Sequence, residues 1–291
     1  MKGFAQRLWT LPQGLAQITQ SSFYYSFLFL PKTKRQAITS IYKLCRAVDD
    51  TVDEPMPRRD PVEALDWWRT EIELSYSGRP RHTLSRELMQ VVHQFAIPKE
   101  YFFDLIDGVE MDLTHRRYET FDELYSYCYR VASVVGLVCI EIFGYRNPTT
   151  KSYAIDLGIA LQLTNILRDL KEDAARDRIY IPRADLRQFL YPEADLLRGV
   201  HDARFVALMQ FECARARQYF DQARSTLPPE DACSLVAARA MEAIYYRLLE
   251  RIERLEYDVF THRIEVPRPQ RFAIALATWL RSMHHRAVLH G

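Results

Sequence analysis

The sequence predicts an all-α fold built as a single domain. Apolar residues recur at helical spacing along most of the 291 residues, and no run alternates apolar and polar residues as a half-buried strand would. Glycine is scarce, at 9 residues, and no glycine-rich phosphate loop or GxGxxG motif occurs, which argues against a nucleotide-binding α/β fold. The length suits one large domain or two modest ones, and no low-complexity linker divides the chain.

Periodicity and prolines together place the helices in order. Proline is tolerated in the first turn of a helix, because its missing N–H would have no partner there. Five prolines lie at or just before expected starts: Pro31, Pro61, Pro98, Pro148 and Pro229. The expected helices are 34–53, 61–78, 84–95, 99–115, 121–145, 150–173, 200–226, 230–258 and 267–287.

Composition limits the classes of function. Hydrophobic residues make up 48% and charged residues 26% of the chain, which is a soluble globular profile. Lys plus Arg total 39 against 38 for Asp plus Glu, so no excess of positive charge indicates nucleic-acid binding. The five cysteines are odd in number and form no CxxC pair, which is typical of reduced core thiols in a cytoplasmic protein.

The two ends of the chain bear on its compartment. The first residues lack the continuous apolar core of a signal peptide. The apolar stretch 272–280 is far shorter than the ~20 residues that a membrane-spanning helix needs. We therefore expect a soluble cytoplasmic protein, and we leave open a peripheral contact with the inner membrane.

The expected helix 34–53 has a polar stripe that ends in carboxylates. Four side chains follow at steps of four, three and four and therefore share one face. They are Tyr42, Arg46, Asp49 and Asp53, with Asp50 beside them. A lone pair of aspartates at this spacing would equally be read as a solvated helix end.

The expected helix 150–173 repeats the arrangement. Its polar stripe steps by three, four and four through an otherwise apolar run. The members are Gln162, Asn165, Asp169 and Asp173, with Glu172 adjacent. A buried amide or carboxylate without a partner costs roughly 1–3 kcal/mol, so a polar ligand is expected to satisfy this face.

Both acidic clusters lie at helix C-termini, where the helix dipole favours cations by about 0.3–1 kcal/mol. Carboxylates at i,i+4 add a few tenths of a kcal/mol of repulsion. Cations that bridge the two clusters would remove this repulsion, and hard oxygen ligands suit Mg²⁺ shared with substrate phosphates. Zinc fits poorly because no cysteine or histidine cluster has ligand spacing. Basic residues that could clamp the remaining phosphate oxygens are Arg46, Arg168, Lys171 and Arg178.

Four segments together resemble one protein family, the squalene/phytoene synthases, which are head-to-head prenyl transferases. The segments are SSFYYSFLFLP (21–31), IYKLCRAVDDTVDE (41–54), YCYRVASVVG (127–136) and QLTNILRDLKEDAARDRIYIP (162–182). They occur in the family's order, and the resemblance runs from about Ser21 to Arg263. The first segment is most similar to bacterial family members that make presqualene diphosphate for hopanoids.

The resemblance implies an isoprenoid-synthase helical bundle around a central cavity. One domain would cover 1–291, with an N-terminal extension at 1–18 and a C-terminal tail at 282–291. Two farnesyl diphosphates would condense to presqualene diphosphate with release of one diphosphate, feeding squalene and hopanoid synthesis. Two or three Mg²⁺ ions would act with the diphosphates, and NADPH is not expected.

The resemblance also assigns roles to residues. The two metal motifs match Asp49, Asp50 and Asp53, and Asn165, Asp169, Glu172 and Asp173. Of these, Asp49, Asp53, Asp169 and Asp173 count as catalytic, together with Tyr127, which matches the tyrosine linked to proton handling. Positions around the substrates match Ser22, Phe23, Tyr42, Arg46, Gln162, Asn165, Arg168, Arg178, Tyr180, Tyr245 and Arg263.

A carbocation formed in such a reaction needs an apolar, aromatic cavity that excludes water. Candidate walls, each more often an ordinary core residue, are Phe23, Tyr24, Phe27, Val131, Val134, Val138, Leu157 and Leu161. The carboxylates of the stretch 105–112 are second-tier candidates beside the cavity. Ser133 and Gln20 depart from the family pattern, which bears on product choice and helix packing more than on ionisation.

Other functions remain as alternatives. The chain could make squalene with NADPH, or phytoene or dehydrosqualene without it. A catalytically silent scaffold with the same fold is disfavoured because both acidic motifs are intact. Expected partners are the prenyl diphosphate and the enzymes that follow in a hopanoid pathway, while the oligomeric state stays open.

Overall fold

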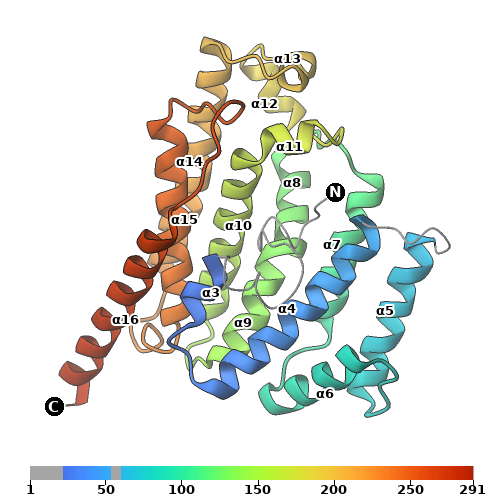
Figure 1. Cartoon of the computed structure of the whole chain (residues 1–291), viewed down its shortest axis with the longest axis vertical. Coiled ribbons are helices and arrows are strands. Elements are labelled where there is room, and N and C mark those ends of the chain that lie inside the picture. The colour runs from blue at the N-terminus through green and yellow to red at the C-terminus, as the bar shows by residue number, and fades with distance from the viewer. Residues whose placement is uncertain (1–21, 54–59, 291) are drawn as a thin grey trace.

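The computed structural model describes the backbone of residues 22–53 and 60–290, and the side chains of 25–52 and 60–283. Within these ranges the chain is all-α, as predicted, and the only β-type pairing is an isolated parallel bridge between Arg117 and Ile179. The helices pack side by side as a bundle, with α10 near its centre and α16 extending from one side (Figure 1). The bundle thus confirms the predicted fold class.

The helix bounds come close to the predicted ones. In order, the elements are α3 Ser22–Phe27, α4 Lys32–Asp53, α5 Pro61–Tyr76, α6 Thr83–Phe95, α7 Glu100–Thr114, α8 Phe121–Cys128, the π-helical turn η1 Tyr129–Ser133, α9 Val134–Phe143, α10 Thr150–Arg168, α11 Leu170–Ala174, α12 Arg183–Gln188, α13 Glu193–Leu197, α14 Ala203–Thr226, α15 Val236–Arg254 and α16 Arg268–His290.

Several differences from the prediction have local causes. The expected helix 150–173 breaks at Asp169, whose φ of −100° and ψ of 15° end α10 and let α11 start in a new direction. The short helices α12 and α13 have five or six residues each, too few for periodicity to reveal. The region 282–290, expected as a tail, continues α16. The predicted extension 1–18 lies outside the described residues.

Helix α10 forms the core of the bundle. It packs against α14, α9, η1, α15 and α8, and every side chain from Leu157 to Leu167 is buried. At Gly158 the neighbouring helix approaches so closely that a Cβ atom would lie 2.4 Å from Ser133 Cα. Ser133 itself donates a 2.7 Å hydrogen bond to Ile155 O. The departure from the family pattern at Ser133 is therefore accommodated by a glycine on the facing helix.

The most apolar segment of the bundle is Phe121–Phe143, which is long and apolar enough to cross a membrane, but 72% of its best window is buried inside the fold. It is thus accounted for as a core helix. Elsewhere, large exposed apolar side chains include Phe272, Leu280 and Met283 on α16, a helix whose sequence contains no Asp or Glu. Cytoplasmic location and peripheral membrane contact stay predictions.

Candidate active site

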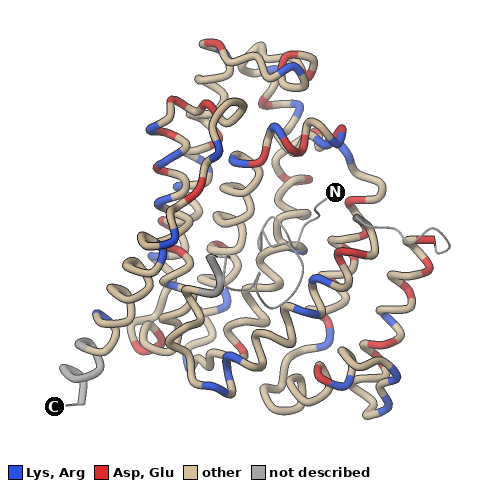
Figure 2. Tube along the Cα trace, in the orientation of Figure 1, with Lys and Arg blue, Asp and Glu red and all other residues tan. Residues whose placement is uncertain are grey.

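The two predicted acidic clusters lie at the C-terminal ends of α4 and α10, and both helices run upward in the view of Figure 1. Helix α11, which follows α10, carries Lys171, Glu172 and Asp173 and shows both charge colours in Figure 2. Asp49 on α4 and Asp173 on α11 are each only 2% exposed. Two carboxylates buried at helix C-termini are costly unless cations or donors compensate them.

The polar stripe on α10 has unsatisfied groups that point to a ligand. Gln162 and Asn165 are completely buried. Asn165 Nδ2 donates to Gln162 Oε1 at 3.5 Å, while Gln162 Nε2 and Asn165 Oδ1 have no hydrogen-bond partner among the described residues. Leaving two such groups unpaired costs about 1–3 kcal/mol each. An oxygen ligand for a cation and a donor for a phosphate oxygen are therefore available here.

Arg168 holds the carboxylate that follows it. Its Nε lies 2.6 Å from Asp169 Oδ1 and its Nη2 lies 2.5 Å from Oδ2. Burial alone would lower the pKa of Arg168, but the Asp169 carboxylate outweighs burial, so this pKa lies above its usual range. Burial raises the pKa of the nearby Tyr245 hydroxyl, and the positive charge of Arg168 opposes that rise. Arg168, Asp169 and Tyr245 thus form one interacting cluster.

At the end of α4, Arg46 pairs with Asp50. Its Nε donates to Asp50 Oδ2 at 3.0 Å, and its Nη2 lies 2.7 Å from Oδ1. Burial raises the pKa of Tyr42 to about 12, although Arg46 lowers it, so the phenol stays protonated and can donate to an anion. Arg46 can therefore bind a phosphate only if its guanidinium contacts Asp50 and the phosphate together, or if its pair with Asp50 breaks.

The predicted catalytic tyrosine, Tyr127, is fully buried and belongs to a network that the sequence did not reveal. Its hydroxyl donates to Asp112 Oδ2 at 3.1 Å, and the Tyr180 hydroxyl donates to Asp112 Oδ1 at 2.8 Å. The Tyr127 and Tyr180 rings stack with centroids 5.2 Å apart. Asp112 was only a second-tier candidate, since no spacing rule connects position 112 with 127 and 180.

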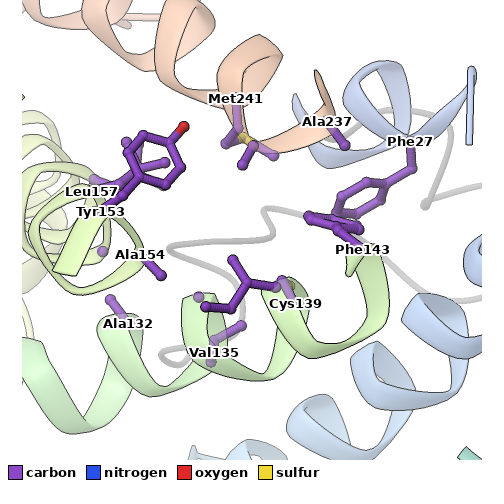
Figure 3. Close-up of a pocket in the computed structure, with 15 residues that line it drawn as sticks. Phe27, Ala132, Val135, Cys139, Phe143, Tyr153, Ala154, Leu157, Ala237 and Met241 are labelled. Carbon is purple, nitrogen blue, oxygen red and sulfur yellow. The ribbon is translucent and has the colours of Figure 1, made fainter. Parts of the chain in front are cut away.

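An apolar cavity of about 60 Å³ lies between α9, α10, α15 and α3. Figure 3 shows Phe27 and Phe143 facing each other at one end of it, and Tyr153 and Leu157 at the other. Leu157 and Asn165 both belong to α10, about 12 Å apart along its axis. Along α10, residues that line the apolar cavity are thus followed by the residues of the polar stripe. Of the predicted walls, Phe27, Leu157 and Leu161 line this cavity.

Other predicted residues are exposed or only half-buried. The Arg263 side chain is 88% exposed and pairs with Glu265 at 3.5 Å, and Glu172 is also exposed. Arg178 is half-buried, and its backbone N–H donates to Asp173 O at 3.0 Å. The side chains of Ser22, Phe23 and Asp53 lie outside the described residues.

The donors present fit magnesium shared with a diphosphate better than a protein-only metal cage. Among the described side chains, which exclude Asp53, no three Asp, Glu, His or Cys residues are close enough to hold an ion together. Mg²⁺ commonly takes one or two carboxylates and completes its shell with water and phosphate oxygens. The buried carboxylates and the unpaired Asn165 Oδ1 meet that requirement.

Comparison with known proteins agrees with this arrangement. The family model described as squalene/phytoene synthase matches residues 17–270. A 15-cis-phytoene synthase from Synechococcus elongatus is 42% identical over 260 residues, covering 84% of both chains.

Two solved structures also share the isoprenoid-synthase fold. The squalene synthase HpnC from Alicyclobacillus acidocaldarius superimposes with a TM-score of 0.76 at 28% identity, covering 87% of this chain and 93% of that one. A dehydrosqualene synthase with bound ligand gives a TM-score of 0.79 at 27% identity, covering 90% and 92%.

Proposed function

Because the chain belongs to the squalene/phytoene synthase family and is a head-to-head prenyltransferase, we propose that it joins two geranylgeranyl diphosphates to form phytoene. The observation that carries this proposal is the 42% identity to a phytoene synthase over 84% of both chains. The similar squalene and dehydrosqualene synthases are 28% and 27% identical. The expected farnesyl diphosphate substrate and presqualene diphosphate product, and the hopanoid pathway with them, therefore have less support than the alternative of phytoene.

In this reaction an allylic diphosphate leaves with the bonding electrons and a carbocation remains. When bound, Mg²⁺ supplies Lewis-acid stabilisation of the leaving diphosphate. Asp49, Asp169, Asp173 and Asn165 would hold it, with Asp53 from the same motif. Gln162 Nε2 and the Tyr245 hydroxyl would orient phosphate oxygens, and Arg168 would balance their charge.

The rest of the site protects the carbocation. The cavity beside α10 is lined by aliphatic and aromatic groups. At about 60 Å³ it admits only part of a prenyl chain unless its walls move apart, and the part that enters would be shielded from water. The aromatic faces of Phe27 and Tyr153, at opposite ends of the cavity, would stabilise positive charge on the prenyl chain. Tyr127, whose predicted role is proton handling, would take a proton from the condensed product.

Product analysis tests the proposal. Purified protein is incubated with Mg²⁺ and either geranylgeranyl or farnesyl diphosphate, with and without NADPH, and extracted products are identified by mass. We expect phytoene from the C20 substrate, independent of NADPH. Conversion of farnesyl diphosphate alone would contradict the proposal, and no diphosphate release with either substrate would favour a silent scaffold.

A C30 product is the second candidate. Its support is the backbone similarity to the two solved C30-type enzymes, with TM-scores of 0.76 and 0.79, and the first sequence motif. Presqualene diphosphate that persists with NADPH would favour a presqualene synthase, whereas conversion to squalene would favour a squalene synthase.

Cys139 offers a test of chain length. It lines the cavity on α9, facing α10 and α15 (Figure 3). A C20 tail exceeds a C15 tail by one isoprene unit, so Cys139→Phe should fill space that only the longer tail needs. We expect the wild type to prefer the C20 over the C15 substrate by roughly 10-fold or more in kcat/KM, and Cys139→Phe to lose this preference. Cys139→Ala, which adds no volume, should keep the wild-type ratio; an unchanged ratio in Cys139→Phe would show that tails do not enter this cavity.

A further inference from the structure

Three separate parts of the chain meet at the carboxylate of Asp112. Asp112 lies on α7, Tyr127 on α8, and Tyr180 on the segment between α11 and α12. Each carboxylate oxygen accepts from a different phenol, at 3.1 Å from Tyr127 and 2.8 Å from Tyr180. Because one charged group satisfies two hydroxyls, both hydroxyl orientations depend on this residue.

The surroundings of Asp112 are dry and aromatic. Asp112 is 6% exposed, and the Tyr118, Tyr127 and Tyr180 rings form a stacked triangle beside it, with centroids 5.2–5.7 Å apart. In the described part of the chain its hydrogen bonds come from phenols, and from no lysine or arginine. The Tyr127 and Tyr180 phenols are therefore the proton donors within hydrogen-bond distance of this carboxylate.

We propose that Asp112 is a positioning residue that acts through Tyr127: it fixes the phenol and receives its proton during turnover. When the condensed cation loses a proton, the C–H electron pair stays with carbon in the new bond. The proton passes to Tyr127 Oη, and the phenol's own proton passes to Asp112 Oδ2. Tyr127 remains a neutral phenol and Asp112 becomes a neutral acid, which returns its proton to released diphosphate or water. The inference rests on the proposed head-to-head chemistry and not on chain length.

A purely structural role for Asp112 is less well supported. The segment that carries Tyr180 is anchored independently by backbone hydrogen bonds from Ile179 N to Arg116 O at 3.0 Å and from Arg183 N to Tyr118 O at 2.9 Å. Asparagine has nearly the volume of aspartate and keeps one acceptor oxygen. Asp112→Asn should therefore leave this segment in place and remove mainly the negative charge and the proton acceptor.

The test is a double-mutant cycle of Asp112→Asn and Tyr127→Phe. Diphosphate release and prenyl product are measured separately, with whichever prenyl diphosphate the wild-type enzyme uses. Each single variant is expected to lower kcat by about 100-fold, a typical contribution of general acid–base catalysis, while KM stays within about 2-fold because the phosphate-binding residues are untouched. Condensed product per diphosphate released should fall as well, because the unquenched cation is captured by water as a prenyl alcohol.

The decisive result is the double variant. If Asp112 acts through Tyr127, Asp112→Asn should lower kcat by less than about 3-fold further in the Tyr127→Phe background. The proposal would be overturned if the fold-reductions in kcat of the two single variants multiplied in the double variant. It would also be overturned if kcat of Asp112→Asn stayed within about 3-fold of wild type. If the effects of Asp112→Asn on kcat were instead non-additive with those of Tyr180→Phe, the role would belong to the Tyr180 phenol and the proposal would equally be overturned. A wild-type enzyme that makes only a C30 product would defeat the phytoene proposal and leave this test intact.

A matched control exists on α9. The Tyr145 hydroxyl donates to Glu141 Oε1 at 3.1 Å, with Lys151 Nζ 3.9 Å from the same oxygen, so this is a second tyrosine–carboxylate contact, outside the proposed site. Glu141→Gln should keep kcat and the product ratio of the wild type. Melting curves of all variants check folding; a conservative Asp112→Glu variant, which restores the acceptor, should regain part of the rate even if Asp112→Asn is less stable.

Discussion

Asp49→Asn is expected to reduce kcat by ~1,000-fold or more while the protein stays folded. The Asp49 carboxylate would hold Mg²⁺ that stabilises the leaving diphosphate, and loss of such stabilisation typically costs several kcal/mol at the transition state. Asp49 is buried at the C-terminal end of α4. The substitution keeps its shape but removes a negative charge from an unfavourable place. Its melting temperature should therefore match or exceed that of the wild type.

Asp169→Asn should be equally inactive but less stable. Arg168 makes a bidentate pair with Asp169, and a mostly buried guanidinium that loses its partner destabilises a fold. Asp66 is an exposed residue of α5 that pairs with Arg69, so Asp66→Asn is the control and should be fully active. Retention of more than about a tenth of the wild-type rate by Asp49→Asn would contradict its role as a metal ligand, given the size of such effects.

Removal of divalent metal is expected to stop turnover completely and reversibly. Chelation followed by added Mg²⁺ should restore the rate, because the carboxylate, amide and phosphate oxygens of this site are hard ligands. Mg²⁺ with inorganic diphosphate should also raise the melting temperature, since a ligand at about 100 times its Kd stabilises a protein by about 2.7 kcal/mol.

Bound metal and diphosphate should also protect the backbone near the site from local opening. Hydrogen exchange at α11 and in the segment 175–181, which follows the second acidic motif, should slow when metal and diphosphate bind. Asp49→Asn should show neither the melting shift nor the slowed exchange. Equal turnover in chelated and Mg²⁺-containing samples would contradict the proposed metal dependence.

Periodicity predicted the helices well because each long helix has one face in the core. It could not place the break at Asp169, which depends on backbone dihedrals at one residue, or the late start of α15. There, Asp231 accepts from the backbone N–H groups of Arg146 and Asn147 at 2.8 and 3.0 Å. Such a contact between distant segments leaves no local pattern in the sequence.

The candidate site was predictable where its residues share a helix. The spacing of Gln162, Asn165 and Asp169 places them on one face, and the structure buries the two amides there. Asp112 was missed as a partner of Tyr127 because their contact crosses helices. The first motif alone pointed to presqualene diphosphate, while identity over most of the chain points to phytoene. We expect substrate length to depend on the volume of a cavity built from four helices, which no single motif encodes.

The central claim is that the ends of α4 and α10 hold one metal–diphosphate site. Crystals soaked with Mn²⁺, which accepts the same oxygen ligands as Mg²⁺, and inorganic diphosphate test it through anomalous scattering. We expect Mn²⁺ peaks bound by carboxylates from the end of α4 and from Asp169 or Asp173, with diphosphate between them. Mn²⁺ found only at other carboxylates, in a protein whose turnover requires Mg²⁺, would contradict it.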